Sequence, residues 1–255
     1  MTPSYDQTIK SFSRVAEQYA KSFYHASKER LDHLVEIFGP SQYDVVLDIA
    51  TGTGNTAFAL APHVKKVIGI DITDIMLDTA KKLGEEYGYS NIEWVKANVE
   101  HLPFTDGYFT GATCRASAHH FIDIDKALDE VRRVLLPGGK FLLVDITAPE
   151  IAMEFMHQIE TIRDPSHVRS YGAEQWKSML AEHGFSIQYV ENIQERWDFE
   201  KWMDNMGLEN STRKLLRNMI MSADQLVKEL LQPEIQNGKL FHNYWHVILL
   251  AKKEI

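Results

Sequence analysis

The chain has 255 residues, of which 44% are hydrophobic and 25% are charged, with 14 glycines and 8 prolines. This composition excludes collagen-like, low-complexity and disordered proteins, and the length suits a single α/β domain. The only cysteine, Cys114, excludes an internal disulfide framework and a multi-thiolate metal site. A net charge of −9 opposes the approach of a phosphate backbone, so we expect no nucleic-acid partner. The sequence has no HExxH motif and no cysteine cluster, so we also expect no bound metal.

The first residues, MTPSYDQTIKSFSRV, lack the apolar segment of a signal peptide. No apolar run approaches the roughly 18 residues that span a membrane. We therefore expect a cytoplasmic protein, either a monomer or a homodimer, that acts on a small molecule.

Apolar residues at three-to-four spacing predict helices over residues 5–38, which Gly39-Pro40 ends. Strands and helices then alternate, and a turn at Pro137-Gly138-Gly139 precedes the fifth strand. The predicted strands are 43–49, 67–70, 92–95, 109–114 and 141–146, and the predicted helices are 55–61, 75–83 and 124–135. This alternation predicts βαβ crossovers and a doubly wound, mostly parallel sheet of Rossmann-like α/β type.

Beyond residue 147 the alternation loosens. We expect helices at 150–162 and 174–182, strands at 186–190 and 245–250, and a mostly helical segment over 194–238. The chain is thus predicted to be one domain, with a helical cap (1–40), a core (41–149) and a part that completes the sheet (150–255). Because ligands bind beyond the carboxyl ends of parallel strands, residues 1–40, 147–172 and 194–240 are expected to form a lid.

The segment VVLDIATGTGN, residues 45–55, is the most specific local feature. A strand containing Asp48 leads into a loop with Gly52 and Gly54, where small residues let the backbone approach a ligand. The helix that follows offers unpaired N–H groups to a polar group. The next strand ends in Asp71, 19 residues after Gly52, where a carboxylate can accept both hydroxyls of a ribose. This pattern fits a dinucleotide site as well as an adenosyl site.

Residues 44–149 resemble the class I S-adenosylmethionine (SAM) dependent methyltransferases, in the branch of the ubiquinone/menaquinone C-methyltransferases. The resemblance rests on five segments in order: VLDIATGTG, VIGIDIT, NIEWVKANVEHLPF, FTGATCRASAHHF and EVRRVLLPGGKFLLVDI. Residues 162–176, IRDPSHVRSYGAEQW, also resemble an uncharacterised bacterial sub-branch. The resemblance implies a seven-stranded sheet with an antiparallel last strand.

The resemblance further implies SAM as the cofactor and S-adenosylhomocysteine (SAH) as the product. The residues that it implies for SAM binding are Tyr19, Asp48, Ala50, Thr51, Gly52, Gly54, Asp71, Ile72, Met76, Asn98, Val99 and Arg115. Two of them depart from the family pattern. Ala50 replaces a glycine, which is tolerable at a negative φ. Asn98 replaces an acidic residue, and its amide can still accept from an adenine amino group.

Catalytic candidates follow the fourth strand. His119 and His120 titrate near neutrality and suit a general base, whereas the alternative is that one of them only packs against the next helix. Arg115 can contact SAM or an anionic substrate, or form a structural ion pair. Cys114 is expected to be a buried, inert strand residue.

Around Pro165, the residues Arg163, His167 and Arg169 can either clamp an anionic substrate group or anchor the lid through ion pairs. Methionines and aromatic residues in the insertions suit an apolar or aromatic acceptor, although most are expected to pack as core. We predict methyl transfer to a carbon, oxygen or nitrogen of a small molecule. An NAD(P)-dependent oxidoreductase and a non-catalytic SAM-binding protein are the alternatives.

Overall fold

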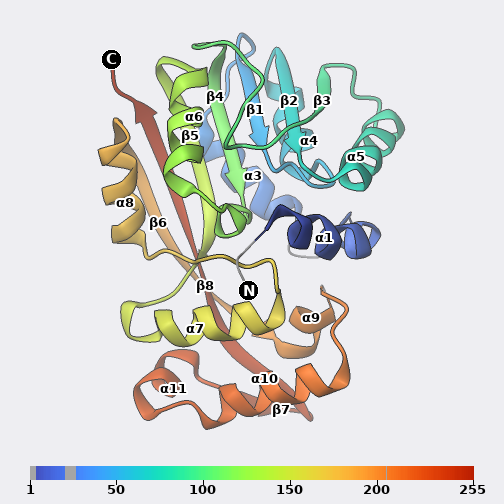
Figure 1. Ribbon diagram of the computed structural model, residues 1–255, viewed down its shortest axis with the longest axis vertical. Coiled ribbons are helices and arrows are strands. Elements are labelled where there is room, and N and C mark those ends of the chain that lie inside the picture. The colour runs from blue at the N-terminus through green and yellow to red at the C-terminus, as the bar shows by residue number, and fades with distance from the viewer. Residues whose placement is uncertain (1–3, 21–26, 205) are drawn as a thin grey trace.

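The computed structural model describes residues 4–204 and 206–255 apart from 21–26, and the side chains of residues 14–20 lie outside this description. The parallel strands lie at the centre of the molecule, and all but the one at the edge of the sheet are runs of mostly buried residues (Figure 1). These strands are β1 (Val45–Ile49), β2 (Lys66–Asp71), β3 (Ile92–Lys96), β4 (Phe109–Arg115) and β5 (Leu135–Thr147). The α/β class predicted from the alternating pattern is therefore confirmed.

Two long strands complete the sheet in the order β3-β2-β1-β4-β5-β8-β6. β8 (Lys239–Lys253) runs antiparallel to both β5 and β6 (Phe185–Asp198), as the resemblance implied for the last strand. Within the described residues the sheet has eight strands and not seven, because β7 (Glu234–Gln236) pairs with β8. The connecting Asn237 and Gly238 have φ values of 50° and 78°, which suits a tight two-residue hairpin turn.

Helices cover both faces of the sheet because neighbouring residues on a strand point to opposite sides. Leu142 and Val144 of β5 pack with α3 (Lys28–Phe38) and α4 (Asn55–Leu60) on one face. Phe141 and Leu143 pack with α6 (Ile124–Val134) and α8 (Ala173–Glu182) on the other. A further helix, α5 (Asp74–Glu86), packs against β2 and β3. Cys114 is 1% exposed in this core, as expected.

A second core surrounds the lower part of the β6–β8 ribbon (Figure 1). It is built from α7 (Glu150–Arg163), α9 (Phe199–Asp204), α10 (Asn210–Ser222) and α11 (Gln225–Leu231). Met156, Phe199, Trp202 and Met203 are each at most 3% exposed there, which confirms that these soft apolar residues pack as core.

Several predicted boundaries were wrong. The two C-terminal strands were predicted too short, and the segment 194–238 begins as strand, contains three separate helices and ends at β7. The predicted turn at residues 137–139 is a bulge inside β5, since Phe109 pairs with Leu135 and Gly111 with Lys140. These strands extend further because β6 and β8 pair with each other beyond the edge of the parallel sheet.

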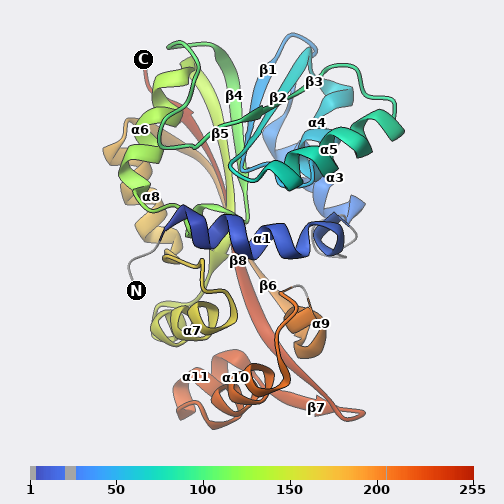
Figure 2. The same ribbon diagram turned by 45° about the vertical axis from the view of Figure 1, so that its right-hand side comes forward.

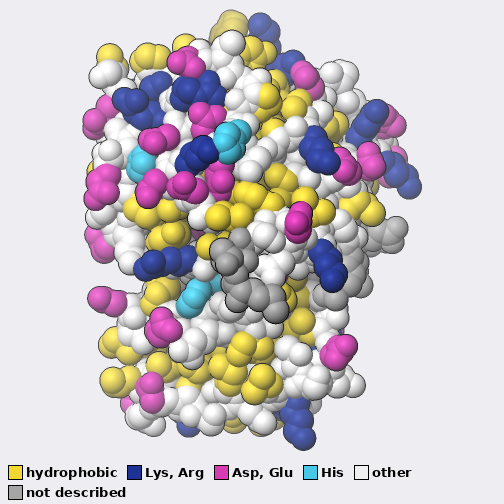
Figure 3. Space-filling model, viewed as in Figure 1, with side chains coloured by type: hydrophobic (Ala, Val, Ile, Leu, Met, Phe, Trp, Pro, Cys, Tyr) yellow, Lys and Arg dark blue, Asp and Glu magenta, His cyan; other side chains and the backbone are white. Residues whose placement is uncertain are grey.

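The remaining helix, α1 (Tyr5–Ala20), crosses the molecule at the carboxyl ends of the parallel strands (Figure 2). On the face drawn in Figure 3, acidic and basic side chains are interspersed and no continuous basic patch is seen. No helix in the described part of the chain has the length and apolarity needed to cross a membrane. The described residues also hold no cluster of three or more His, Cys, Asp or Glu side chains suited to a metal ion.

Candidate active site

A cavity of about 900 Å³, open to solvent, lies at the carboxyl ends of β1, β2 and β4. Residues that are far apart in the chain meet there because parallel strands end at the same edge of a sheet. Most residues that the resemblance implied for SAM binding line this cavity. They are Asp48, Ala50, Thr51, Gly52, Asp71, Ile72, Met76, Asn98, Val99 and Arg115. The Tyr19 side chain lies outside the described residues.

Asp48 holds the loop that follows β1. Its carboxylate is 1% exposed and accepts from the hydroxyl groups of Thr51 at 2.5 Å and Thr113 at 2.7 Å. Burial raises the pKa of Asp48, and these hydrogen bonds partly oppose that shift. Through its hydrogen bond with Thr51, Asp48 orients the loop.

Asp71, at the end of β2, connects the loop after β1 to the loop after β2 through hydrogen bonds. Its carboxylate accepts from the backbone N–H groups of Gly52 at 3.0 Å and Thr73 at 2.8 Å. Burial raises the pKa of Asp71, and the hydrogen bonds from the two N–H groups oppose only part of that rise. A carboxylate has lone pairs beyond the two in use here, so Asp71 can accept further hydrogen bonds from the cavity.

Gly52 and Gly54 of this loop each need the absence of a side chain, but for different reasons. Gly52 has a φ of 54°, and a Cβ built there meets nothing within 4 Å, so the backbone borders open space. Gly54 has a φ of 89°, and a Cβ there would lie 2.7 Å from Trp94 and 2.8 Å from Phe58. Gly54 is absent from the described lining of the cavity, so its requirement is close packing behind the loop.

Ala50 corrects one sequence expectation, because its φ is 50° and not negative. Ala116, at the end of β4, has a φ of 53°, and both alanines line the cavity. The left-handed conformation costs a residue with a Cβ roughly 1–2 kcal/mol. Strain of this kind concentrates at functional sites, where the backbone must turn sharply beside a ligand.

Helix α1 supplies lining residues that sequence reasoning missed, namely Tyr5, Thr8 and Phe12. Their spacing places them on one face of the helix, and that periodicity is the signal that could have identified them. The Tyr5 hydroxyl donates to the Glu100 carboxylate, which also accepts from the N–H groups of Ile122 and Asp123. By contrast, the described lining includes no residue of 147–172 or 194–240, so these parts of the predicted lid do not cover this cavity.

Comparison with known proteins agrees with this geometry. Residues 47–143 match a family model described as a methyltransferase domain. The chain is 36% identical over 198 residues to the uncharacterized methyltransferase YcgJ of Bacillus subtilis, covering 77% of this chain and 78% of that protein. The crystal structure of YcgJ superposes with a TM-score of 0.84 and 30% identity, over 88% of this chain and 98% of YcgJ. This chain belongs to the class I SAM-dependent methyltransferases.

The methyltransferase is also 41% identical over 119 residues to the ubiquinone/menaquinone biosynthesis C-methyltransferase UbiE of Francisella tularensis. That match covers 45% of this chain and 48% of UbiE. The cofactor of this methyltransferase is SAM, and the open space beside Gly52 and the remaining lone pairs of Asp71 fit its adenosyl and methionine parts.

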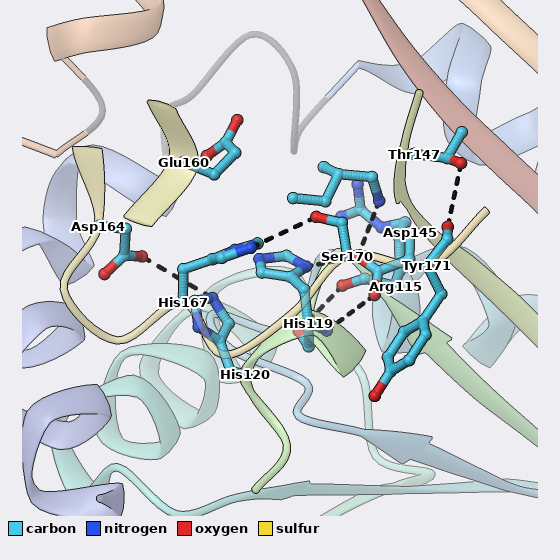
Figure 4. Close-up of polar contacts among 12 residues, drawn as sticks. Arg115, His119, His120, Asp145, Thr147, Glu160, Asp164, His167, Ser170 and Tyr171 are labelled. Carbon is cyan, nitrogen blue, oxygen red and sulfur yellow. Dashed lines mark hydrogen bonds and ion pairs between the residues drawn. The ribbon is translucent and has the colours of Figure 1, made fainter. Parts of the chain in front are cut away.

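His119 belongs to a buried network beside the cavity and is absent from the described lining. Its Nδ1 lies 2.5 Å from Asp145 Oδ1, and its backbone N–H donates to Asp145 Oδ2 at 2.8 Å (Figure 4). Burial lowers the pKa of His119 well below its usual value and raises that of Asp145 to about 7. The imidazole of His119 thus ties the turn after β4 to β5. A general-base role for His119 stays a prediction.

His120 does line the cavity, with the ring of Phe12 edge-on to it at 5.0 Å. Its Nδ1 donates to the Ser166 carbonyl at 3.0 Å, and its Nε2 lies 3.8 Å from Asp164 Oδ2. Both ring nitrogens thus contact the loop that follows α7, and Figure 4 shows the one beside Asp164. A general-base role for His120 stays a prediction.

The residues around Pro165 form hydrogen bonds and ring contacts with other parts of the protein. Arg163 donates to Glu160 at 2.9 Å, and its guanidinium lies 5.0 Å from the centre of the Trp202 ring. The N–H groups of Val168 and Arg169 both donate to the carbonyl of His119. These contacts favour the anchor interpretation of the segment over a clamp for an anionic substrate.

Proposed function

We propose that this methyltransferase transfers the methyl group of SAM to a small organic molecule. The observation that carries the proposal is the cavity at the ends of β1, β2 and β4, where Asp71 and the loop of Asp48 and Gly52 lie beneath α1. The UbiE relative is named for ubiquinone and menaquinone biosynthesis, and this supports a small organic molecule as the acceptor.

In this proposal the binding roles follow from hydrogen-bond capacity. The lone pairs that Asp71 has left accept the two ribose hydroxyls, and Gly52 lets the backbone approach the methionine part. Asn98 and Val99 lie beside the adenine. The Asn98 oxygen already accepts from the Glu100 N–H at 2.9 Å, so one lone pair remains for the adenine amino group.

When bound, SAM supplies a methyl carbon on a sulfonium, whose positive charge disappears as the methyl group leaves. The protein therefore mainly has to align the acceptor and exclude water. Helix α1 serves the second purpose, because Tyr5 and Phe12 fix it over the cavity through Glu100 and His120. Arg115 is held at the end of β4 by its Nε, which donates to the Thr56 hydroxyl at 2.9 Å.

Two measurements test this proposal. We expect SAH to raise the melting temperature, whereas NADH leaves it unchanged; stabilisation by NADH alone would establish the oxidoreductase alternative. Next, the protein is incubated with methyl-labelled SAM and a small-molecule metabolite extract. A labelled product of low mass is expected, and its absence from an SAH-binding protein would favour the non-catalytic alternative.

A further inference from the structure

A second cavity, of about 400 Å³, lies against Arg115 and is otherwise separate from the first in its described lining. Its walls come from α3, β5, β6 and β8, on the sheet face that α3 covers. Arg115 is the residue that both linings share. Arg115 therefore lies between the two cavities and borders both.

The floor of this second cavity is aliphatic and flat. Val144, Ile193 and Ile248 come from the neighbouring strands β5, β6 and β8, and Val144 pairs directly with Ile248. Leu34 of α3 stands opposite as an apolar wall. Such a surface suits the planar or branched apolar body of a small molecule.

The rim is polar and includes two guanidinium groups. Arg30 contacts both oxygens of Glu195, at 2.9 Å and 2.6 Å. His246 Nδ1 lies 3.7 Å from Glu195, and burial lowers the pKa of His246 to about 3, so this imidazole is neutral near pH 7. Because a guanidinium has several N–H donors, Arg30 and Arg115 can serve protein acceptors and still bind a ligand oxygen.

We propose that this second cavity is the acceptor subsite and that it takes a small acid, with an apolar body and one anionic oxygen group. The apolar body lies on Val144, Ile193 and Ile248, and the anionic group lies at Arg30 and Arg115. This inference rests on the proposed function, because an acceptor at Arg115 lies beside a methyl donor only if the first cavity binds SAM.

Benzoate and its neutral isostere benzamide probe the site by calorimetry, each titrated into protein saturated with SAH. We expect benzoate to bind at least about fivefold more tightly than benzamide, since hydrogen bonds to charged groups are the stronger ones. Equal affinity for the two probes, or no benzoate binding, would overturn the acid assignment. Competition between benzoate and SAH would place the probe in the first cavity and overturn the subsite.

Ile193→Trp fills the second cavity, and the matched control is Asn192→Trp, at the next, exposed position of β6. We expect I193W to weaken benzoate binding about tenfold or more while SAH affinity stays within about twofold, and N192W to change neither. Unchanged benzoate binding in I193W refutes the subsite. If I193W does not fold, Arg30→Gln serves instead, and it should weaken benzoate but neither benzamide nor SAH. Loss of SAH binding in the wild-type protein would instead refute the proposed function.

Discussion

Replacing Asp71 by Asn tests the SAM site most directly. The carboxylate is 9% exposed and accepts from Gly52 and Thr73, whereas an amide has only one accepting oxygen. One of the two N–H donors then faces an NH₂ group, and an unsatisfied buried donor costs about 1–3 kcal/mol. The ribose then loses one hydrogen bond to a charged acceptor, which contributes about 1.5–3 kcal/mol. We therefore expect SAH affinity to fall about 10- to 100-fold and the melting temperature to fall by several degrees.

Calorimetric titration with SAH measures this loss of affinity, and urea unfolding measures the loss of stability separately. Asp74→Asn is the matched control, because Asp74 is exposed and pairs with Lys96 at the surface. It should leave SAH affinity unchanged. If folded D71N binds SAH within about threefold of the wild-type protein, Asp71 does not hold the ribose.

Three further changes test other parts of the structure. Ala50→Gly relieves a positive φ, so the free energy of unfolding of this variant should equal that of the wild-type protein or exceed it by up to about 1 kcal/mol. The control Ala181→Gly, within α8, should lower the free energy of unfolding by about 1 kcal/mol. Equal losses for the two variants in urea unfolding would contradict the strain at Ala50. Tyr5→Phe removes the hydrogen bond from α1 to Glu100, so the affinity for SAH should fall about fivefold. An unchanged Kd for SAH would show that α1 does not close the site. His242 is buried and its folded pKa is about 4, so its neutral form stabilises the protein above about pH 6.5 and this stabilisation is lost as the pH falls toward 4. His242→Phe should reduce the stability lost between about pH 6.5 and 5 by about 2 kcal/mol in urea unfolding, and an identical loss in both proteins would exclude His242 as the cause.

Local patterns in the sequence predicted the parallel strands, the loop from Asp48 to Gly54 and the carboxylate of Asp71. These features depend on periodicity and on residues at the ends of strands, which short stretches of sequence record. The Asn237-Gly238 pair between β7 and β8 is a dipeptide that favours a hairpin turn, so the helical prediction over 194–238 was wrong at this position.

Other features depend on partners far away in the chain. The full lengths of β6 and β8 depend on their mutual pairing, in which Asp198 lies opposite Phe241. The positive φ of Ala50 depends on the tight exit from β1, where the Thr51 N–H donates to the Ile70 carbonyl of β2. No local propensity of alanine indicates this conformation, because the neighbouring strand imposes it.

The amino-acid sequence alone determined the fold class, the cofactor loop and the chemistry of the residues that border it. Tertiary structure decided that His119 pairs with the buried Asp145, that α1 lines the first cavity, and that Arg30 and Glu195 meet beside Arg115. The physical reason is that hydrophobic periodicity operates over a few residues. A cavity, by contrast, is bounded by side chains that only the packing of distant helices and strands brings together.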